Sequence, residues 1–200
     1  MNHLKQLKQL EKYGSNKRLA AESWSEPWQT LIATALSART RDDTTIPIAT
    51  NLFQEYNTLE KLSKAKTSDI EIIIRKINYH KTKSRHVIDC AKMLVKEYNR
   101  KVPLDFNELV KLPGVGRKTA NVFLSEMGFS AIGIDTHLSY ISQKLEWTKN
   151  KKPEKIEQDL KILFPKEYWS SLNPILVKFG QTYTNRKKKD EILEKIKRIN

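Results

Sequence analysis

Apolar residues recur three or four positions apart along almost the whole chain, which is the pattern of amphipathic helices. Clear stripes are Leu4, Leu7 and Leu10; Ile70, Ile73, Ile74 and Ile77; Val87, Ala91 and Leu94; and Ile192, Ile196 and Ile199. The alternation typical of a β-strand is absent, except for a short stretch at residues 131–134. The pattern therefore predicts an all-α protein of roughly ten helices.

Polar residues in front of several stripes indicate where helices begin. Ser68 with Glu71, and Asp105 with Glu108, have the three-residue spacing of capping boxes. Asp42 is expected to cap the helix that follows it. After a turn with two glycines, a further helix is predicted from about Arg117 to Met127.

Length and composition narrow the class of protein. A chain of 200 residues allows one large domain or two small ones. No apolar run approaches the ~20 residues that a membrane-spanning helix needs. Residues 1–10 alternate Leu with Lys and Gln and contain no apolar segment like that of a signal peptide. We therefore expect no membrane association and a location inside the cell, in the cytoplasm or nucleoid.

The charge balance points to a polyanionic partner. Lys and Arg number 37 against 23 Asp and Glu, which gives a formal net charge of +14. Nucleic acid is the commonest partner of such a protein. A generally lysine-rich, solvated surface explains the same charge, so composition alone leaves both interpretations open.

Residues 112–120 read Leu-Pro-Gly-Val-Gly-Arg-Lys-Thr-Ala and carry the most specific signal in the chain. They predict a tight turn with glycines at Gly114 and Gly116 that leads directly into a helix. The N–H groups of such a turn and of the helix start form a ready site for one phosphate, without reading any base. A lone Gly-x-Gly is more often an ordinary helical corner closed by a glycine cap.

The whole string resembles the helix-hairpin-helix of the endonuclease III family of DNA glycosylases. The resemblance continues at 134–137, Ile-Asp-Thr-His, and at 25–42, and in order and spacing it covers about residues 25–180. It implies a two-lobed all-α fold with a DNA-binding cleft between the lobes. One lobe is expected at 20–130 with the hairpin, and the other at 1–19 plus 131–200.

Lys118 is the candidate nucleophile. It is expected in the first helical turn, where the helix dipole and the neighbouring cations Arg117 and Lys111 disfavour a further positive charge. With burial in a cleft, these effects push an amine toward its neutral form, which can attack a sugar carbon and form a Schiff base. The alternative is a surface lysine that contacts phosphate.

Asp135 is the candidate carboxylate. By itself it is placed to cap the next helix, which runs from Thr136 to about Leu145. The resemblance implies that it also assists base departure by stabilising positive charge on the sugar and by deprotonating the amine. His137, in the same string, is interpreted as a structural residue at the helix start.

The resemblance implies base excision repair of double-stranded DNA. A lysine at position 118 implies a bifunctional DNA glycosylase and abasic-site lyase, which flips a damaged base and nicks by β-elimination. We expect oxidised pyrimidines as substrates and a monomer. The alternatives are a glycosylase of the same superfamily for mismatched or other damaged bases, and a hairpin module that only binds DNA.

Further DNA-contacting residues are expected in the hairpin and in two other loops. The hairpin candidates are Gly114, Val115, Gly116, Arg117 and Thr119. Arg39 stands where the family has a polar residue that faces the orphaned base; an exposed partner for Asp42 or Asp43 is the alternative. Tyr79 or His80 stands at the family's intercalating wedge and can stack on bases, although a plain turn before a helix also explains them.

Cofactor expectations follow from the cysteines. Cys90 is the chain's one cysteine, so the family's cluster of iron and sulfur held by four cysteines cannot form. Residues 180–189 replace the cluster loop without a cysteine, and residues 191–200 are expected to dock there as a helix or to remain a solvated tail. Independently of the cysteines, a monovalent cation is expected as a ligand of the hairpin backbone.

Overall fold

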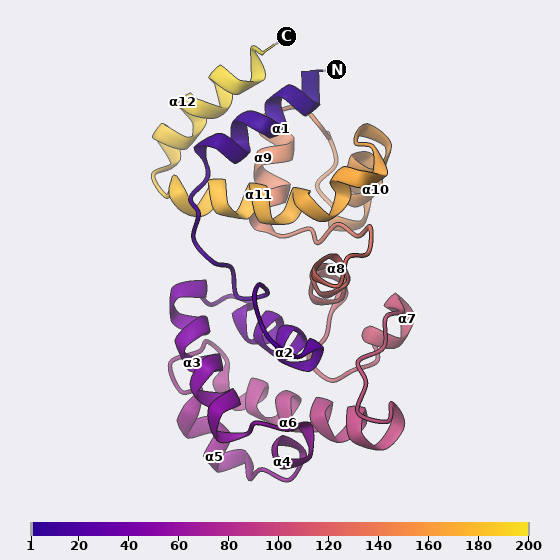
Figure 1. Ribbon diagram of the computed structural model, residues 1–200. Helices are drawn as coiled ribbons and strands as arrows, with labels where there is room; N and C mark the ends of the chain where they lie inside the picture. Colours follow the sequence, from indigo (N-terminus) through magenta and orange to yellow (C-terminus); the bar gives the residue numbers. More distant parts are fainter. Residues whose placement is uncertain (1, 200) are drawn as a thin grey trace. The chain divides into compact units, whose positions relative to one another are not determined.

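The computed structural model describes residues 2–199 and is helical throughout (Figure 1). Within this range it contains twelve α-helices, one short 3-10 helix and no strand, so the predicted all-α class is confirmed. Residues 131–135 form an irregular connection between two helices, and the strand-like pattern there was therefore misleading. No helix in the described range has both the length and the apolar character needed to cross a bilayer.

The chain forms two compact units. Arg18–Met127, here called the hairpin unit, contains the glycine turn at 114–116. Met1–Lys17 with Gly128–Asn200, here called the terminal unit, contains both ends of the chain and Asp135.

The hairpin unit is built around α2. This helix is buried on most of its surface, because apolar residues such as Leu31, Ile32 and Leu36 occupy several of its faces. It packs against α3 and α8, while α4 and α5 pack against α6 and α7 packs against α8. The helices are α2 (Pro27–Ser37), α3 (Asp42–Glu55), α4 (Leu59–Ser63), α5 (Thr67–Ile73), α6 (His80–Glu97), α7 (Phe106–Leu109) and α8 (Arg117–Glu126).

Two helix starts in the hairpin unit differ from the prediction. The N-cap of α3 is Arg41, so Asp42 is the first helical residue, where its charge favours the positive end of the helix dipole. The box predicted for Ser68 and Glu71 is absent, because α5 begins one residue before Ser68. The Ser68 hydroxyl instead donates to the adjacent Asp69 carboxylate.

Half of the second predicted box is present. Asp105 caps α7 and accepts from the backbone N–H groups of Asn107 and Glu108 at 2.8 and 3.1 Å. The Glu108 side chain accepts instead from Tyr98 and Lys111. The first turn of α7 is thus fixed immediately before the glycine turn.

The terminal unit is arranged around α11. This helix contacts α1 and α9, and α12 contacts the same two helices; α1 and α12 lie side by side in Figure 1. The helices are α1 (Asn2–Tyr13), α9 (Thr136–Lys144), α10 (Pro153–Leu163), the 3-10 helix η1 (Lys166–Tyr168), α11 (Trp169–Thr182) and α12 (Arg186–Lys197).

The last helix docks rather than forming a solvated tail. Its buried residues are Leu193 and Ile196, whereas Ile192 and Ile199 of the predicted stripe are only partly covered. Lys197 forms an ion pair with Glu146 at 2.8 Å, and Gln6 of α1 donates to the Lys197 carbonyl at 3.3 Å. The first and last helices of the chain are therefore held in one core.

Candidate active site and nucleic-acid interface

The glycine turn joins α7 to α8 within a few residues. Gly114 adopts a φ of +79°, which side-chain-bearing residues rarely adopt, and a Cβ there would lie 2.9 Å from Cβ of His86 on α6. The Val115 N–H closes the turn by donating to the Leu112 carbonyl at 3.0 Å. Gly114 is thus required by the internal geometry of the hairpin.

Gly116 has a different environment. It is the N-cap of α8 with an ordinary φ of −93°, it is exposed, and a Cβ there would meet no atom within 4 Å. Another backbone can therefore approach closely at this point. The first turn of a helix also presents N–H groups that the helix itself cannot satisfy, which is the arrangement that binds a phosphate.

The other hairpin candidates divide into buried and exposed residues. The side chains of Val115 and Thr119 are buried, each residue being 6% exposed, so a DNA contact at these positions comes from the main chain. Arg117 is exposed, and its guanidinium lies 5.1 Å from the ring centroid of Phe106. Arg117 is therefore the hairpin candidate whose side chain faces solvent.

Lys118 is the second residue of α8 and is partly exposed. Lys118 belongs to the end of the helix where the dipole is positive. Lys118 lies two residues after Gly116, the open point of the turn.

Asp135 begins α9 in the terminal unit. Its Oδ1 accepts from the Leu138 N–H at 2.8 Å, so the predicted helix cap is present. A carboxylate has acceptor sites on both oxygens, and Asp135 is partly exposed. Capping and a further role for the carboxylate are therefore compatible.

Helix α11 holds the segment that carries Asp135. The buried Asn173 side chain donates to the Gly133 carbonyl at 2.6 Å. Gly180 packs on His137 so closely that a Cβ would lie 2.1 Å from the imidazole Nδ1. His137 thus has the structural position expected for it, whereas the role of Asn173 was missed. The sequence does carry a signal for this role, because Asn173 is a polar residue among apolar positions, next to Leu172 and three residues before Leu176.

The structure brings Arg39 and Tyr79 together from two loops. Both have left-handed backbone conformations, with φ of 59° and 60°. The Arg39 guanidinium lies 5.2 Å from the Tyr79 ring centroid, within the range of a cation–π contact. Asn78 links the loops by donating to the Arg39 carbonyl and, from its N–H, to the Thr40 hydroxyl at 3.1 Å. His80 is partly exposed at the start of α6.

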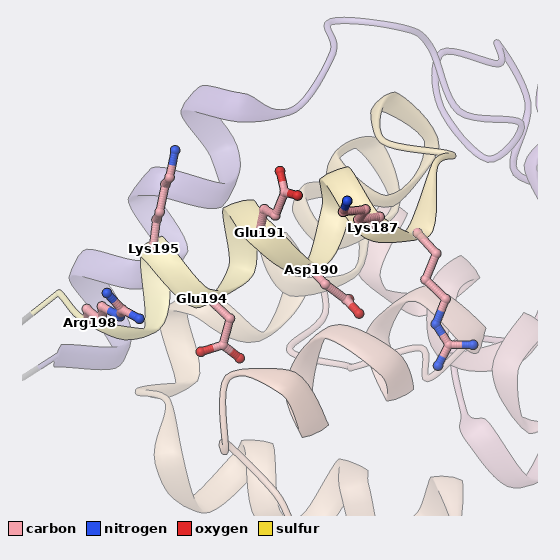
Figure 2. Close-up of a pocket in the computed structure, with 7 residues that line it drawn as sticks. Lys187, Asp190, Glu191, Glu194, Lys195 and Arg198 are labelled. Carbon is pink, nitrogen blue, oxygen red and sulfur yellow. The ribbon is translucent and has the colours of Figure 1, made fainter.

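The first turn of α12 carries the basic run Arg186, Lys187, Lys188 and Lys189. Arg186 and Lys189 lie 5.6 and 6.0 Å from the Tyr140 ring centroid, beside Lys144 at 5.7 Å. Farther along the helix acidic and basic residues are mixed. Figure 2 shows Asp190, Glu191 and Glu194 among Lys187, Lys195 and Arg198 along an open groove of about 870 Å³. The run of four consecutive basic residues therefore lies at the beginning of this helix, and its last turn adds Lys195 and Lys197.

Cys90 is part of the core of the hairpin unit. It is buried on α6, and burial raises the pKa of its thiol to about 12, so the thiolate that metals bind is disfavoured. Among residues 2–199 no three His, Cys, Asp or Glu side chains gather in a way that could hold a metal ion.

Two helical units, a hairpin with an open glycine at a helix start and a net charge of +14 are features of the helix-hairpin-helix class of DNA-binding proteins. Residues 32–166 match the HhH-GPD superfamily of base excision DNA repair proteins, and the chain belongs to that superfamily. It is accordingly an enzyme, a DNA glycosylase of base excision repair.

Relatives of known identity support this assignment. The chain is 40% identical to endonuclease III of Thermotoga maritima over 159 residues, which is 78% of this chain and 74% of that protein. It is 36% identical to endonuclease III of Bacillus subtilis over 78% of this chain and 73% of that protein. A solved structure of a trapped endonuclease III–DNA covalent intermediate matches with a TM-score of 0.81 and 33% identity, covering 88% of this chain and 83% of that one.

Proposed function

We propose that the protein is a bifunctional DNA glycosylase and abasic-site lyase that removes oxidised pyrimidines, with Lys118 as the nucleophile. The observation that carries the proposal is the position of Lys118 in the first turn of α8, two residues after the open Gly116. The similar solved structure is that of a trapped endonuclease III–DNA covalent intermediate. A covalent adduct with DNA is also what a nucleophilic lysine at this position would form.

The proposed reaction uses one amine and one carboxylate. The neutral amine of Lys118 attacks the sugar carbon that bears the damaged base, and the base leaves with the electrons of the glycosidic bond. Asp135 stabilises the positive charge that develops on the sugar and accepts a proton from the amine. The sugar ring then opens at the C1′–O4′ bond, which leaves a protonated imine between Lys118 and the sugar. This imine acidifies the C2′ protons, and loss of one of them breaks the C3′–O bond and expels the 3′ phosphate by β-elimination.

The proposed partner is double-stranded DNA with a damaged base or an abasic site, bound by a monomer inside the cell. Carbonyl oxygens of the hairpin are the hard donors that suit a monovalent cation, which we retain as a proposed ligand of that loop. With a single cysteine, the chain cannot supply the four thiolates of an iron–sulfur cluster.

Borohydride trapping tests the nucleophile. The wild-type protein should form a covalent adduct with duplex DNA that contains an abasic site, and Lys118→Ala should form none while it still binds the duplex. Lys92→Ala is the matched control, because Lys92 is exposed on α6 and its ion pair is with Asp89 on the same helix. Normal trapping by Lys118→Ala would exclude Lys118 as the nucleophile.

A panel of duplexes with single lesions tests the substrate class. Release of oxidised pyrimidines ahead of a mismatched thymine and an oxidised guanine supports the proposal. Preference for a mismatch or another lesion would contradict the proposed substrate class, but it would agree with membership of the superfamily. Binding without base release or nicking on any duplex would leave only a DNA-binding module.

A further inference from the structure

The first two turns of α6 connect two loops of the hairpin unit that are expected to contact DNA, the loop with Arg39 and the loop with Tyr79. Tyr79 is the N-cap of this helix, and Lys83 follows one turn later on it. The Lys83 ammonium donates to the carbonyls of Leu36 and Ala38, at 2.7 and 2.6 Å, across 47 and 45 residues of sequence. Lys83 therefore ties the end of α2 to the start of α6.

The surroundings of Lys83 are mostly apolar. It lines a cavity of about 110 Å³ with side chains of α2, with Val87 and Cys90 of α6, and with residues 113–115 of the hairpin. Burial lowers the pKa of Lys83 to about 8, since the ammonium has lost part of its water. Its two described partners are carbonyls at the negative end of the α2 dipole, and such charge-assisted hydrogen bonds offset the lost hydration.

The two carbonyls lead directly into Arg39. Ala38 immediately precedes Arg39, and Asn78 holds the carbonyl of Arg39 itself. Arg39 and Tyr79 both have left-handed conformations that cost free energy in residues other than glycine. Such conformations persist only where the surrounding structure enforces them, and Lys83 and Asn78 are placed to do so for Arg39.

We propose that Lys83 is a positioning residue, which keeps Arg39 stacked on Tyr79 so that the two side chains meet DNA as one preassembled pair. This inference rests on the proposed function, since it assigns both side chains to the damaged duplex. The gain is preorganisation: a turn that is already ordered loses less conformational freedom when it binds.

The alternative is that Lys83 only caps α2 and stabilises the fold. The two possibilities differ in whether the effect of Lys83 depends on Arg39. A double-mutant cycle measures that dependence. The readout is the dissociation constant for a duplex with a tetrahydrofuran abasic analogue, compared with a single strand that carries the same analogue.

Lys83→Met should weaken binding to the analogue duplex by about tenfold, the scale of a lost charged hydrogen bond, and should leave single-strand binding within about twofold. In an Arg39→Ala background, Lys83→Met should change duplex binding by less than about twofold. Lys83→Arg, which keeps the charge and the donors, should restore part of the affinity. Lys96→Met, which removes an exposed charge from the same helix, is the control and should bind as the wild type does.

An equal loss with and without Arg39, or an equal loss on single-stranded DNA, would overturn the proposal. If thermal melting shows that Lys83→Met is unfolded, the same cycle is run with Lys83→Arg, whose different geometry should still act only through Arg39. The analogue duplex carries no base to release, so the cycle is independent of Lys118 chemistry. Failure of borohydride trapping and failure of the cycle are therefore separate results.

Discussion

Asp135 both begins a helix and carries the carboxylate that the proposed chemistry requires. Asp135→Asn separates the two, because asparagine caps a helix about as well as aspartate but has no charge. The melting temperature should hold, while single-turnover base release falls by about 10²-fold or more. DNA binding should hold or tighten, since a negative charge is removed. An unchanged rate of base release would show that Asp135 is only a helix cap.

The two glycines of the hairpin should respond differently to alanine. Gly114→Ala should lower the free energy of unfolding by about 1–3 kcal/mol, because it forces a left-handed conformation on alanine, and its Cβ would also press on His86. Gly116→Ala should leave stability unchanged, since a methyl group there meets no protein atom, yet it should weaken binding to abasic duplex. Chemical denaturation and DNA titration of both variants check this. Normal binding by Gly116→Ala would contradict close approach of the DNA backbone at this turn.

At the scale of elements, α12 occupies the end of the chain where the family's cluster loop is replaced. Deleting residues 186–200 removes the buried Leu193 and Ile196, each worth at most ~1.5–3 kcal/mol. The melting temperature should fall, and Leu193→Ala should reproduce part of the fall, whereas Lys195→Ala on the exposed face should not. Metal analysis of the purified protein should find no iron. An unchanged melting temperature after the deletion would show that α12 does not contribute to the stability of the protein.

The contact of α12 with α9 should also depend on pH. Burial alone raises the pKa of Asp190, but hydrogen bonds from Tyr140 and Lys144 outweigh it and lower the pKa below its ordinary value. A carboxyl whose pKa is lowered on folding stabilises the protein above its ordinary pKa, and this contribution is lost as the pH falls through the lowered value.

Asp190→Asn should therefore melt below the wild type at neutral pH. The difference should shrink as the pH is lowered from about 5, and melting curves over that range measure it. A difference that does not change with pH would mean that the Asp190 interactions do not depend on its charge.

For the whole molecule, the net charge of +14 should appear in the salt dependence of DNA binding. Each phosphate that the protein neutralises adds ~0.9 to the slope of log affinity against log salt. Replacing Lys187 and Lys188 together by Gln should lower the slope by up to ~0.9 for each phosphate that is no longer neutralised, without changing the melting temperature. The same charge change at the exposed Lys64 and Lys66 is the control. Equal slopes for the wild type and the α12 variant would show that Lys187 and Lys188 do not neutralise DNA phosphates.

Local order along the chain was predictable from sequence because it depends on neighbours three or four positions apart. The stripe at Leu7 and Leu10, the cap at Asp105 and the start of α8 at Arg117 follow from such spacing. The same reasoning failed at Ser68, where the adjacent Asp69 is the partner of the hydroxyl. Spacing also predicted that Ile192 and Ile199 are buried and did not identify Leu193. The buried side of α12 is set by its packing against α1 and α9, which spacing within the helix does not reveal.

The sequence by itself determined the helical class, the glycine turn and the membership that the string at 112–120 indicated. The tertiary structure decided which distant groups meet. Lys83 reaches Leu36, Asn173 reaches Gly133, and Arg39 stacks on Tyr79. None of these contacts has a sequence signature, because each joins segments that only packing brings together. Motifs are set by local backbone geometry, whereas the groups that hold a site in place are set by packing between elements far apart in the chain.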